Sequence, residues 1–208
     1  MPIATFPIGP LSTNSYIISS AGEAVAIDVG GEPDAMLDYL RAQNLMLADI
    51  CLTHMHFDHL YGVAALAEAT GAPVLGPAGD KPIMDTESSV GGIWGMPPVP
   101  PFKMEYLPDG KAVLGGMECE IIQTPGHTPG GVSLYFPAEN SVFTGDALFY
   151  RSLGRTDFPG GSHQQLLHSI RDRLFALPDE TVVYPGHGPA TTIGDEKRHN
   201  PFCGLYVQ

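Results

Sequence analysis

The sequence predicts an α/β sandwich built from two similar halves. Short segments rich in β-branched and aromatic residues alternate with amphipathic helical stretches in both halves of the 208-residue chain. The 25 glycines and 20 prolines separate these segments and indicate many turns between short elements. Hydrophobic residues make up 43% of the chain and no linker interrupts it, so we expect one domain over residues 1–208.

The first half combines four predicted strands with two predicted helices. The strands are residues 14–18, 24–28, 49–53 and 73–75, where β-branched and apolar residues stand between turn residues. Residues 33–44 form a predicted helix, because Met36, Leu37 and Leu40 share one face and Pro33 stands near its start. Residues 63–71 form the other predicted helix, which Gly71 ends.

Residues 80–110 interrupt this alternation. Within them the stretch SVGGIWGMPPVPPF is rich in glycine and proline, holds the single tryptophan, Trp94, and cannot form regular structure for long. Two interpretations stay open: a surface excursion, or a flap at residues 90–102 beside a pocket, since long loops on rigid scaffolds often carry binding residues.

The second half returns to strands, predicted at residues 119–124, 132–136, 141–144 and 181–185. Before the last strand, residues 162–177 form a predicted helix. Its apolar face consists of Leu166, Leu167, Ile170 and Leu174. Ser162 and Gln165 have the spacing of a capping box at its start.

Charge and cysteine content restrict the class of protein. The formal net charge of −13 disfavours nucleic acid and anionic membrane as partners and leaves a small molecule as the expected one. Three cysteines, Cys51, Cys119 and Cys203, show no CxxC spacing, which is typical of buried thiols in a reducing compartment. The start MPIATFPIGP has no basic stretch, and no segment is apolar enough for a membrane span, so we expect a soluble cytoplasmic protein.

Ligand-type side chains follow the ends of four predicted strands. The motif THMHFDH places His54, His56, Asp58 and His59 after one strand, and three further candidates follow other strands: His127, Asp146 and His187. From composition alone, an HxHxDH motif arises by chance on the order of once in a thousand such chains. Ligands in layered α/β folds bind beyond the carboxyl ends of strands, so we expect these residues to converge. His163, His168 and His199 are set aside, because two lie on a predicted helix and one lies near the C-terminus.

The residue types indicate a catalytic metal site. Imidazole and carboxylate suit two divalent ions, zinc first and iron or manganese as alternatives. Structural zinc sites are closed and rich in cysteine, whereas these seven candidates include none. His54 and His56 can face one ion from an extended turn, Asp58 and His59 can face a second, and Asp146 can bridge both. Two such ions activate water and polarise a carbonyl or phosphoryl oxygen.

The motifs THMHFDH, TPGHT, FTGDALF and YPGHGP resemble the successive motifs of the metallo-β-lactamase superfold, and AIDVGG resembles its leading aspartate motif. The resemblance covers nearly the whole chain and implies an αββα sandwich of two mixed sheets flanked by helices, with the metals at one edge. It implies a first metal held by His54, His56 and His127 and a second held by Asp58, His59 and His187. Asp146 would bridge them, and Asp28 would position ligands.

Finer motifs resemble the glyoxalase II branch. GDALFYRSLGRTDFPGGS and GHGPATTIGDEKRHNPF are similar to its compact bacterial members, which lack the C-terminal helical domain. This implies hydrolysis of an S-acylglutathione thioester, with S-lactoylglutathione as the type substrate and a 2-hydroxy acid and glutathione as products. Asp58 would be the catalytic residue, because it can orient the attacking water and take its proton.

Two departures bear on the substrate. The chain ends six residues after Phe202 without a lysine or arginine for glutathione, and GRTDF stands where larger glyoxalase II enzymes carry a Lys-Phe-Tyr type stretch. Arg151 and Arg155 are candidates to hold a glutathione carboxylate instead; the alternative for Arg155 is a structural ion pair with Asp157.

Three rival functions stay open. GRTDF and TGDAL resemble persulfide dioxygenases, which would use one iron at His54, His127 and Asp146, whereas GHGPATTIG with His187 resembles the hydrolases. Lactone or β-lactam hydrolysis needs the same water chemistry. A nuclease is disfavoured by the charge.

Overall fold

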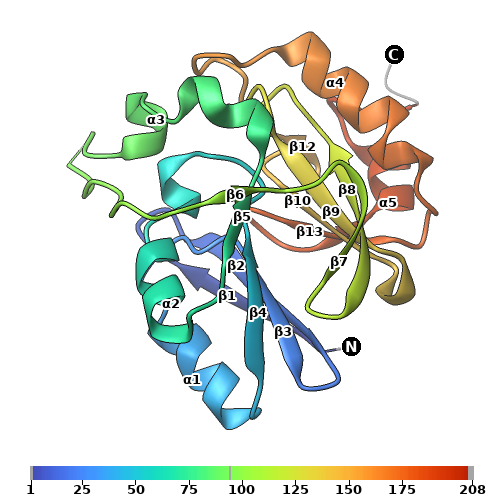
Figure 1. The fold of residues 1–208 in the computed structure, drawn as a ribbon. Helices are drawn as coiled ribbons and strands as arrows, with labels where there is room; N and C mark the ends of the chain where they lie inside the picture. The colour runs from blue at the N-terminus through green and yellow to red at the C-terminus, as the bar shows by residue number, and fades with distance from the viewer. Residues whose placement is uncertain (1, 94, 206–208) are drawn as a thin grey trace.

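The computed structural model describes residues 2–93 and 95–205, and these form four layers in the order helix, sheet, sheet, helix (Figure 1). The first sheet has the strand order β1-β2-β3-β4-β5-β6, and its strands are Ile3–Ile8, Thr13–Ser20, Glu23–Ile27, Met46–Cys51, Val74–Gly76 and Glu105–Tyr106. The second sheet has the order β14-β13-β10-β9-β8-β7, and these strands are Thr191–Thr192, Val182–Pro185, Ser141–Gly145, Val132–Phe136, Met117–Gln123 and Gly110–Leu114. A separate hairpin pairs β11 (Leu148–Phe149) with β12 (Ser152–Leu153).

Both sheets are mixed, as predicted. In the first sheet, β1, β2 and β3 pair antiparallel and β4, β5 and β6 continue in parallel. In the second sheet, β7 to β10 form an antiparallel meander, and β13 adds in parallel to β10. Each half therefore begins with antiparallel strands and continues with a parallel one, and β14 closes the second sheet antiparallel to β13. The predicted αββα sandwich is confirmed.

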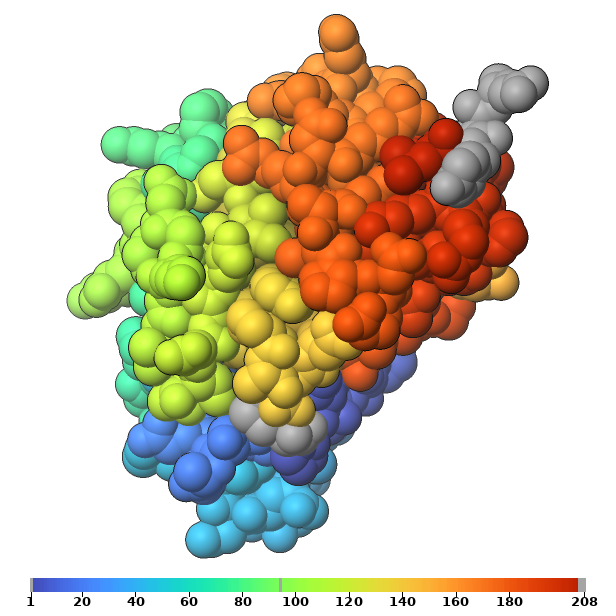
Figure 2. Space-filling model, turned by 90° about the vertical axis from the view of Figure 1, so that its right-hand side faces the viewer, coloured from blue at the N-terminus to red at the C-terminus, as the bar shows by residue number. Residues whose placement is uncertain are grey.

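Alternation along the strands divides the core into three layers. Tyr16 and Ile18 face the second sheet, where they join a cluster with Phe136 and Phe143, whereas Ile17 faces the helices on the other side. Successive side chains of a strand point to opposite faces, so one strand serves two layers. The outer layers are completed by α1 (Asp34–Ala42) and α2 (Val63–Thr70) on the first sheet and by α4 (His163–Asp172) and α5 (Ile193–His199) on the second. Seen from the side of α4 and α5, the C-terminal half covers most of the molecular face (Figure 2).

The predicted helices are present with adjusted ends. α2 ends at Thr70, and Gly71 follows in the left-handed conformation with φ 74°. α4 starts at a cap in which the Ser162 hydroxyl accepts a hydrogen bond from the Gln165 N–H. The prediction that this helix runs to residue 177 was wrong by one turn: α4 ends at Asp172 and a 3₁₀ turn, Leu174–Ala176, follows. Leu177 is extended, the conformation favoured before Pro178.

Residues 80–110 contain only short elements among their described part. These are the end of the 3₁₀ turn Ala78–Ile83, the single-turn α3 (Glu87–Val90), a bridge between Gly91 and Pro98, and β6. Trp94 lies outside the described residues. The prediction that this stretch forms no long regular structure is confirmed for the residues that the structure describes.

All three cysteines are buried free thiols, as expected. In the described part of the chain, no helix has the length and apolar character needed to cross a bilayer.

Candidate metal centre

Seven side chains meet at the edge where the carboxyl ends of strands from both sheets come together. His54 and His56 follow β4, and Asp58 and His59 lie on the 3₁₀ turn Phe57–His59. The other three follow strands of the second sheet: His127 after β8, Asp146 directly after β10, and His187 after β13. The structure thus brings together all seven residues that the sequence placed after strand ends.

The side chains form two groups of three. The ring nitrogens of His54, His56 and His127 offer one ligand atom each, all within 4.8 Å of one another, and Nδ1 of His56 lies 2.8 Å from Nε2 of His127. The same limit holds for the ligand atoms of Asp58, His59 and His187. We call these sets the first trio and the second trio. They are the two ligand sets that the family resemblance implied.

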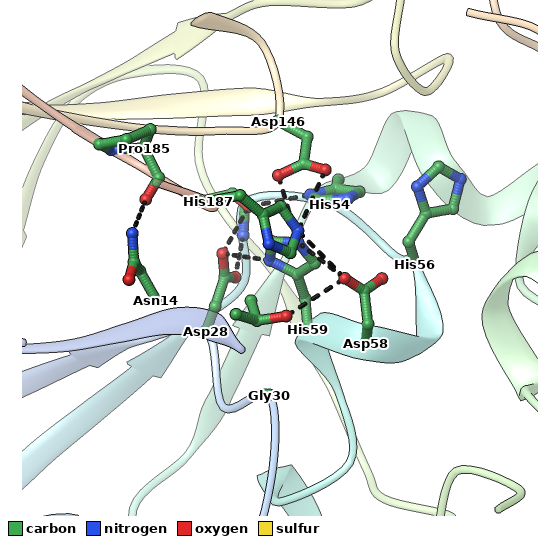
Figure 3. Close-up of polar contacts among 12 residues, drawn as sticks. Asn14, Asp28, Gly30, His54, His56, Asp58, His59, Asp146, Pro185 and His187 are labelled. Carbon is green, nitrogen blue, oxygen red and sulfur yellow. Dashed lines mark hydrogen bonds and ion pairs between the residues drawn. The ribbon is translucent and has the colours of Figure 1, made fainter. Parts of the chain in front are cut away.

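Asp146 lies between the two trios. Its Oδ2 is 3.6 Å from Nε2 of His127 in the first trio and 3.6 Å from Nε2 of His187 in the second. Its Oδ1 is 3.3 Å from Nε2 of His59. Figure 3 shows the carboxylates of Asp146 and Asp58 directed at His59 and His187. This is the position that a bridging carboxylate needs.

Asp28 fixes the orientation of two of these imidazoles. Its Oδ2 accepts hydrogen bonds from the Thr53 hydroxyl, at 2.7 Å, and from Nδ1 of His59, at 2.8 Å. Because the Thr53 hydroxyl donates to Asp28, it accepts from Nδ1 of His54, at 3.0 Å. With Nδ1 protonated in both rings, Nε2 keeps the lone pair that binds a metal. Asp28 has φ 54°, an uncommon conformation for a residue other than glycine.

His127 is oriented in the same way by a main-chain group. Its Nδ1 donates to the carbonyl oxygen of Arg155, at 2.7 Å, which again leaves Nε2 for a metal. The sequence analysis considered only the side chain of Arg155, either for a glutathione carboxylate or for an ion pair with Asp157. A backbone carbonyl carries no sequence signal, so this contact had to come from the structure.

Asp80 is a buried residue that sequence reasoning missed. Its Oδ2 accepts from the Met55 N–H, at 2.9 Å, and its Oδ1 accepts from the Gly130 N–H, at 2.6 Å. Met55 stands between His54 and His56, and Gly130 lies in the loop of His127. Asp80, on the 3₁₀ turn Ala78–Ile83, therefore joins the two loops that carry the first trio.

The start of β2 supports the second trio. The hydroxyl of Thr13 donates to Oδ2 of Asp58, at 3.2 Å. Nδ2 of Asn14 donates to the carbonyl oxygens of Pro185, at 3.0 Å, and Gly188, at 2.8 Å, on both sides of His187. The sequence prediction included these residues only in or next to a strand.

Buried polar atoms of the centre fit a divalent metal. Among the described residues, Nε2 of His54 is buried without a hydrogen-bond partner, and Nε2 of His59 and Oδ1 of Asp146 are buried with only an ion-pair contact to each other, at 3.3 Å. Leaving such atoms unsatisfied costs about 1–3 kcal/mol each. Burial lowers the pKa of His54 well below its usual range and that of His56 to about 3, so both rings are neutral, the form that binds metal.

The second trio favours positive charge. Burial works against a charged His59, but the nearby carboxylates of Asp58, Asp28 and Asp146 raise its pKa well above the usual value. The pKa of Asp146 is lowered: burial opposes this, but His59 and the other imidazoles outweigh burial. A metal ion would displace the proton from His59, and the neutral imidazole that results, beside ionised carboxylates, matches zinc, iron(II) or manganese(II). A divalent ion bound there would supply Lewis acidity and activate water at neutral pH.

A cavity of about 360 Å³ opens onto the centre. Its lining contains five of the seven candidate ligands, His56, Asp58, His127, Asp146 and His187, together with Leu11, Phe57, Ser88, Phe149, Arg155 and Phe158. Of residues 90–102, none that the structure describes lines this cavity. Pro97, Pro98 and Pro100 instead line a separate cavity with Pro10 and Tyr61, and the choice between surface excursion and flap stays a prediction.

Both arginines considered for glutathione are engaged in ion pairs. Nε and a terminal nitrogen of Arg155 each lie 2.6 Å from an oxygen of Asp157, which confirms the structural alternative for Arg155. Arg151 contacts Glu196 at 2.9 Å and Asp195 at 2.8 Å, and it is not among the residues that line the cavity. Its ion pairs to α5, a helix that the sequence analysis did not predict, argue against the role considered for Arg151.

The three histidines set aside lie outside the centre. His168 pairs with Asp172 at 2.9 Å, and His199 lies 4.0 Å from Asp195 on α5. His163 is exposed at the start of α4.

Comparison with known proteins agrees with this geometry. The family model of the Metallo-beta-lactamase superfamily matches residues 8–187. A probable metallo-hydrolase of Bacillus subtilis, YqgX, is 35% identical over 94% of this chain and 94% of its own length. The hydroxyacylglutathione hydrolase GloC of Haemophilus influenzae is 35% identical over 97% of this chain and 98% of its own length.

Solved structures are similar over nearly the whole chain. The B3 metallo-beta-lactamase BLEG-1 has a TM-score of 0.91 at 36% identity, covering 97% of this chain and 99% of its own. TTHA1623 in a di-iron-bound form has a TM-score of 0.86 at 40% identity, covering 97% and 100%. ETHE1 from Myxococcus xanthus has a TM-score of 0.78 at 35% identity, covering 98% and 85%.

Proposed function

The chain belongs to the metallo-beta-lactamase superfamily, and from that premise we propose that it is a binuclear metal-dependent thioesterase of the glyoxalase II type. Its proposed substrates are S-acylglutathiones, with S-lactoylglutathione as the type substrate. The observation that carries the proposal is the position of Asp146 between two complete trios, which provides ligands for two ions. The relative GloC, a hydroxyacylglutathione hydrolase, supports the choice of substrate.

In the proposed reaction, water attacks the thioester carbonyl, the carbon–sulfur bond breaks, and the products are a carboxylic acid and a thiol. His54, His56 and His127 would hold one metal ion and Asp58, His59 and His187 the other. Asp146, which lies between the two trios, would contribute to both sites. These ions would supply Lewis acidity for the carbonyl and lower the pKa of water. Asp58 lines the cavity, where it orients the attacking water and accepts its proton. A thiolate leaves readily, so the leaving group needs little acid assistance.

The positioning residues keep this arrangement ready before substrate binds. Asp28 and the Arg155 carbonyl hold three imidazoles in the tautomer with a free Nε2. The Thr13 hydroxyl holds one oxygen of Asp58. Groups fixed in advance need no reorganisation during the reaction.

A persulfide dioxygenase is the second candidate. The similarity to ETHE1 and the segment GRTDF, whose Arg155 and Phe158 line the cavity, favour it. A one-iron dioxygenase would need only His54, His127 and Asp146. The complete second trio supports the hydrolase instead.

The deciding experiment measures hydrolysis of S-lactoylglutathione by the purified, metal-analysed protein, beside the Asp58→Ala variant. We expect turnover that the variant loses, with about two metal ions per chain as in two-metal sites. Oxygen uptake with glutathione persulfide and one iron per chain would instead establish the dioxygenase. Absence of thioester hydrolysis with both sites filled would refute the proposed substrate class.

A further inference from the structure

The walls of the cavity are largely apolar once the candidate ligands are set apart. Four of the six remaining lining residues are apolar: Leu11, Phe57, Phe149 and Phe158. The ring centroid of Phe158 lies 5.2 Å from that of His56 in the first trio. The ring centroid of Phe149 lies 6.1 Å from that of His187 in the second trio. One phenylalanine thus flanks each end of the metal centre.

Apart from the metal ions that the centre would hold and the imidazoles paired with its carboxylates, the described lining of the cavity offers one cation, and that cation is paired. Arg155 is the only lysine or arginine among these lining residues, and its guanidinium donates two hydrogen bonds to the carboxylate of Asp157. Its guanidinium lies 4.1 Å above the ring of Phe158, which keeps it against the wall. The net charge of −13 adds a general repulsion for anions. The carboxylates of a glutathione carrier would therefore gain little binding free energy from the side chains that line the cavity.

We propose that the cavity selects its substrate by an uncharged acyl group whose apolar part is held between Phe149 and Phe158, so that thioesters with longer apolar acyl groups bind more tightly than the lactoyl thioester. The charged ends of the thiol carrier lie outside the cavity. A volume of about 360 Å³ is near the lower end for ligand pockets and suits an acyl group rather than a whole carrier. The proposal rests on the proposed function for the identity of the bond that is cleaved, and it adds the class of acyl group.

Binding of thioethers that cannot be hydrolysed tests the proposal. The zinc-loaded protein is titrated, with NMR detection, with S-alkylglutathiones and uncharged S-alkyl-N-acetylcysteamines from methyl to hexyl. Each methylene that enters the cavity should lower Kd by up to about fourfold until the cavity is filled. For one alkyl group, the two carriers should differ by less than about threefold in Kd, the range of weak exposed ion pairs.

Variants assign the effect to named side chains. Phe158→Ala and Phe149→Ala should reduce the gain per methylene. The matched control Phe202→Ala should not, because Phe202 is 55% exposed and does not line the cavity. Asp157→Asn frees Arg155, so glutathione ligands should then bind up to about fivefold more tightly than their uncharged counterparts.

Two results would overturn the proposal. One is a Kd that does not change with alkyl length. The other is wild-type binding of glutathione ligands at least about tenfold tighter than binding of the uncharged ligands, well above the range of exposed ion pairs. Failure of the thioesterase function would appear separately, as absent hydrolysis both of S-lactoylglutathione and of a thioester with an apolar acyl group, while the binding series would still be readable.

Discussion

Asp80 links the two loops of the first trio, and its removal should cost both stability and metal affinity. In Asp80→Ala the N–H groups of Met55 and Gly130 lose their acceptor. Hydrogen bonds to a charged group contribute about 1.5–3 kcal/mol each, so two give about 3–6 kcal/mol. Burial raises the pKa of Asp80 despite these bonds, which shows that the carboxylate already carries a desolvation cost. We therefore expect a loss of about 3 kcal/mol, the lower end of that range.

Urea unfolding of the metal-free protein measures this loss as a change in midpoint at constant slope. Asp85→Ala is the matched control, since Asp85 is exposed on the same segment and should change stability by less than about 0.5 kcal/mol. Chelator competition should show zinc binding weakened about 10- to 100-fold at one site, assigned to His127 by ring ¹⁵N shifts. Either of two results would refute the reasoning. One is a loss in the free energy of unfolding below about 1 kcal/mol, the contribution of one ordinary hydrogen bond. The other is zinc binding that is weakened equally at both sites.

Four further predictions follow from contacts described above. Asp28→Ala should weaken zinc binding about 10- to 100-fold, measured by chelator competition, because His59 loses its orienting acceptor; unchanged affinity would contradict this. The hydrogen bond from Arg155 lowers the pKa of Asp157 to about 2, so its stabilising effect is present above about pH 4 and disappears toward pH 2. A carboxyl NMR titration should show this midpoint, which Arg155→Gln should return to about 4. Thr192→Ala removes the cap of α5 and should cost about 1 kcal/mol in urea unfolding; no change would mean that the cap hydrogen bond is not formed. Zinc at a hundredfold excess over its Kd should raise the free energy of unfolding by about 2.7 kcal/mol relative to chelator-treated protein, and equal stability of the two forms would argue against a site formed by folding.

The metal centre could be predicted because its residues carry local signals. The HxHxDH motif contains four ligand-type residues within six positions. The other candidate ligands each follow a short apolar strand, so their positions at strand ends predict that all of them meet at one edge of the fold. Asp80 could not be predicted in this way. It acts on the main chain of residues 25 and 50 positions away, and an N–H donor is common to nearly every residue.

Two of the elements that the sequence analysis missed, β1 and α5, have weak apolar patterns. β1 lies at the edge of its sheet with no fully buried residue and contains Pro7, which edge strands tolerate. α5 carries charged residues along most of its length, and its start depends on a cap in which Thr192 accepts from the Asp195 N–H. The acidic first turn and basic last turn complement the helix dipole. Missing α5 also left Arg151 without its structural partners in the sequence analysis, since these lie on that helix.

Arg155 makes two separate contributions, one through its main chain and one through its side chain. The carbonyl oxygen holds His127, while the guanidinium lies over Phe158 at the cavity wall. Every amino acid provides the carbonyl, so the side chain is free to change without disturbing the imidazole. Related enzymes can therefore diverge in substrate through this residue and Asp157 at little cost to the metal centre. A directed library at these two positions is a short route to altered acyl or carrier preference.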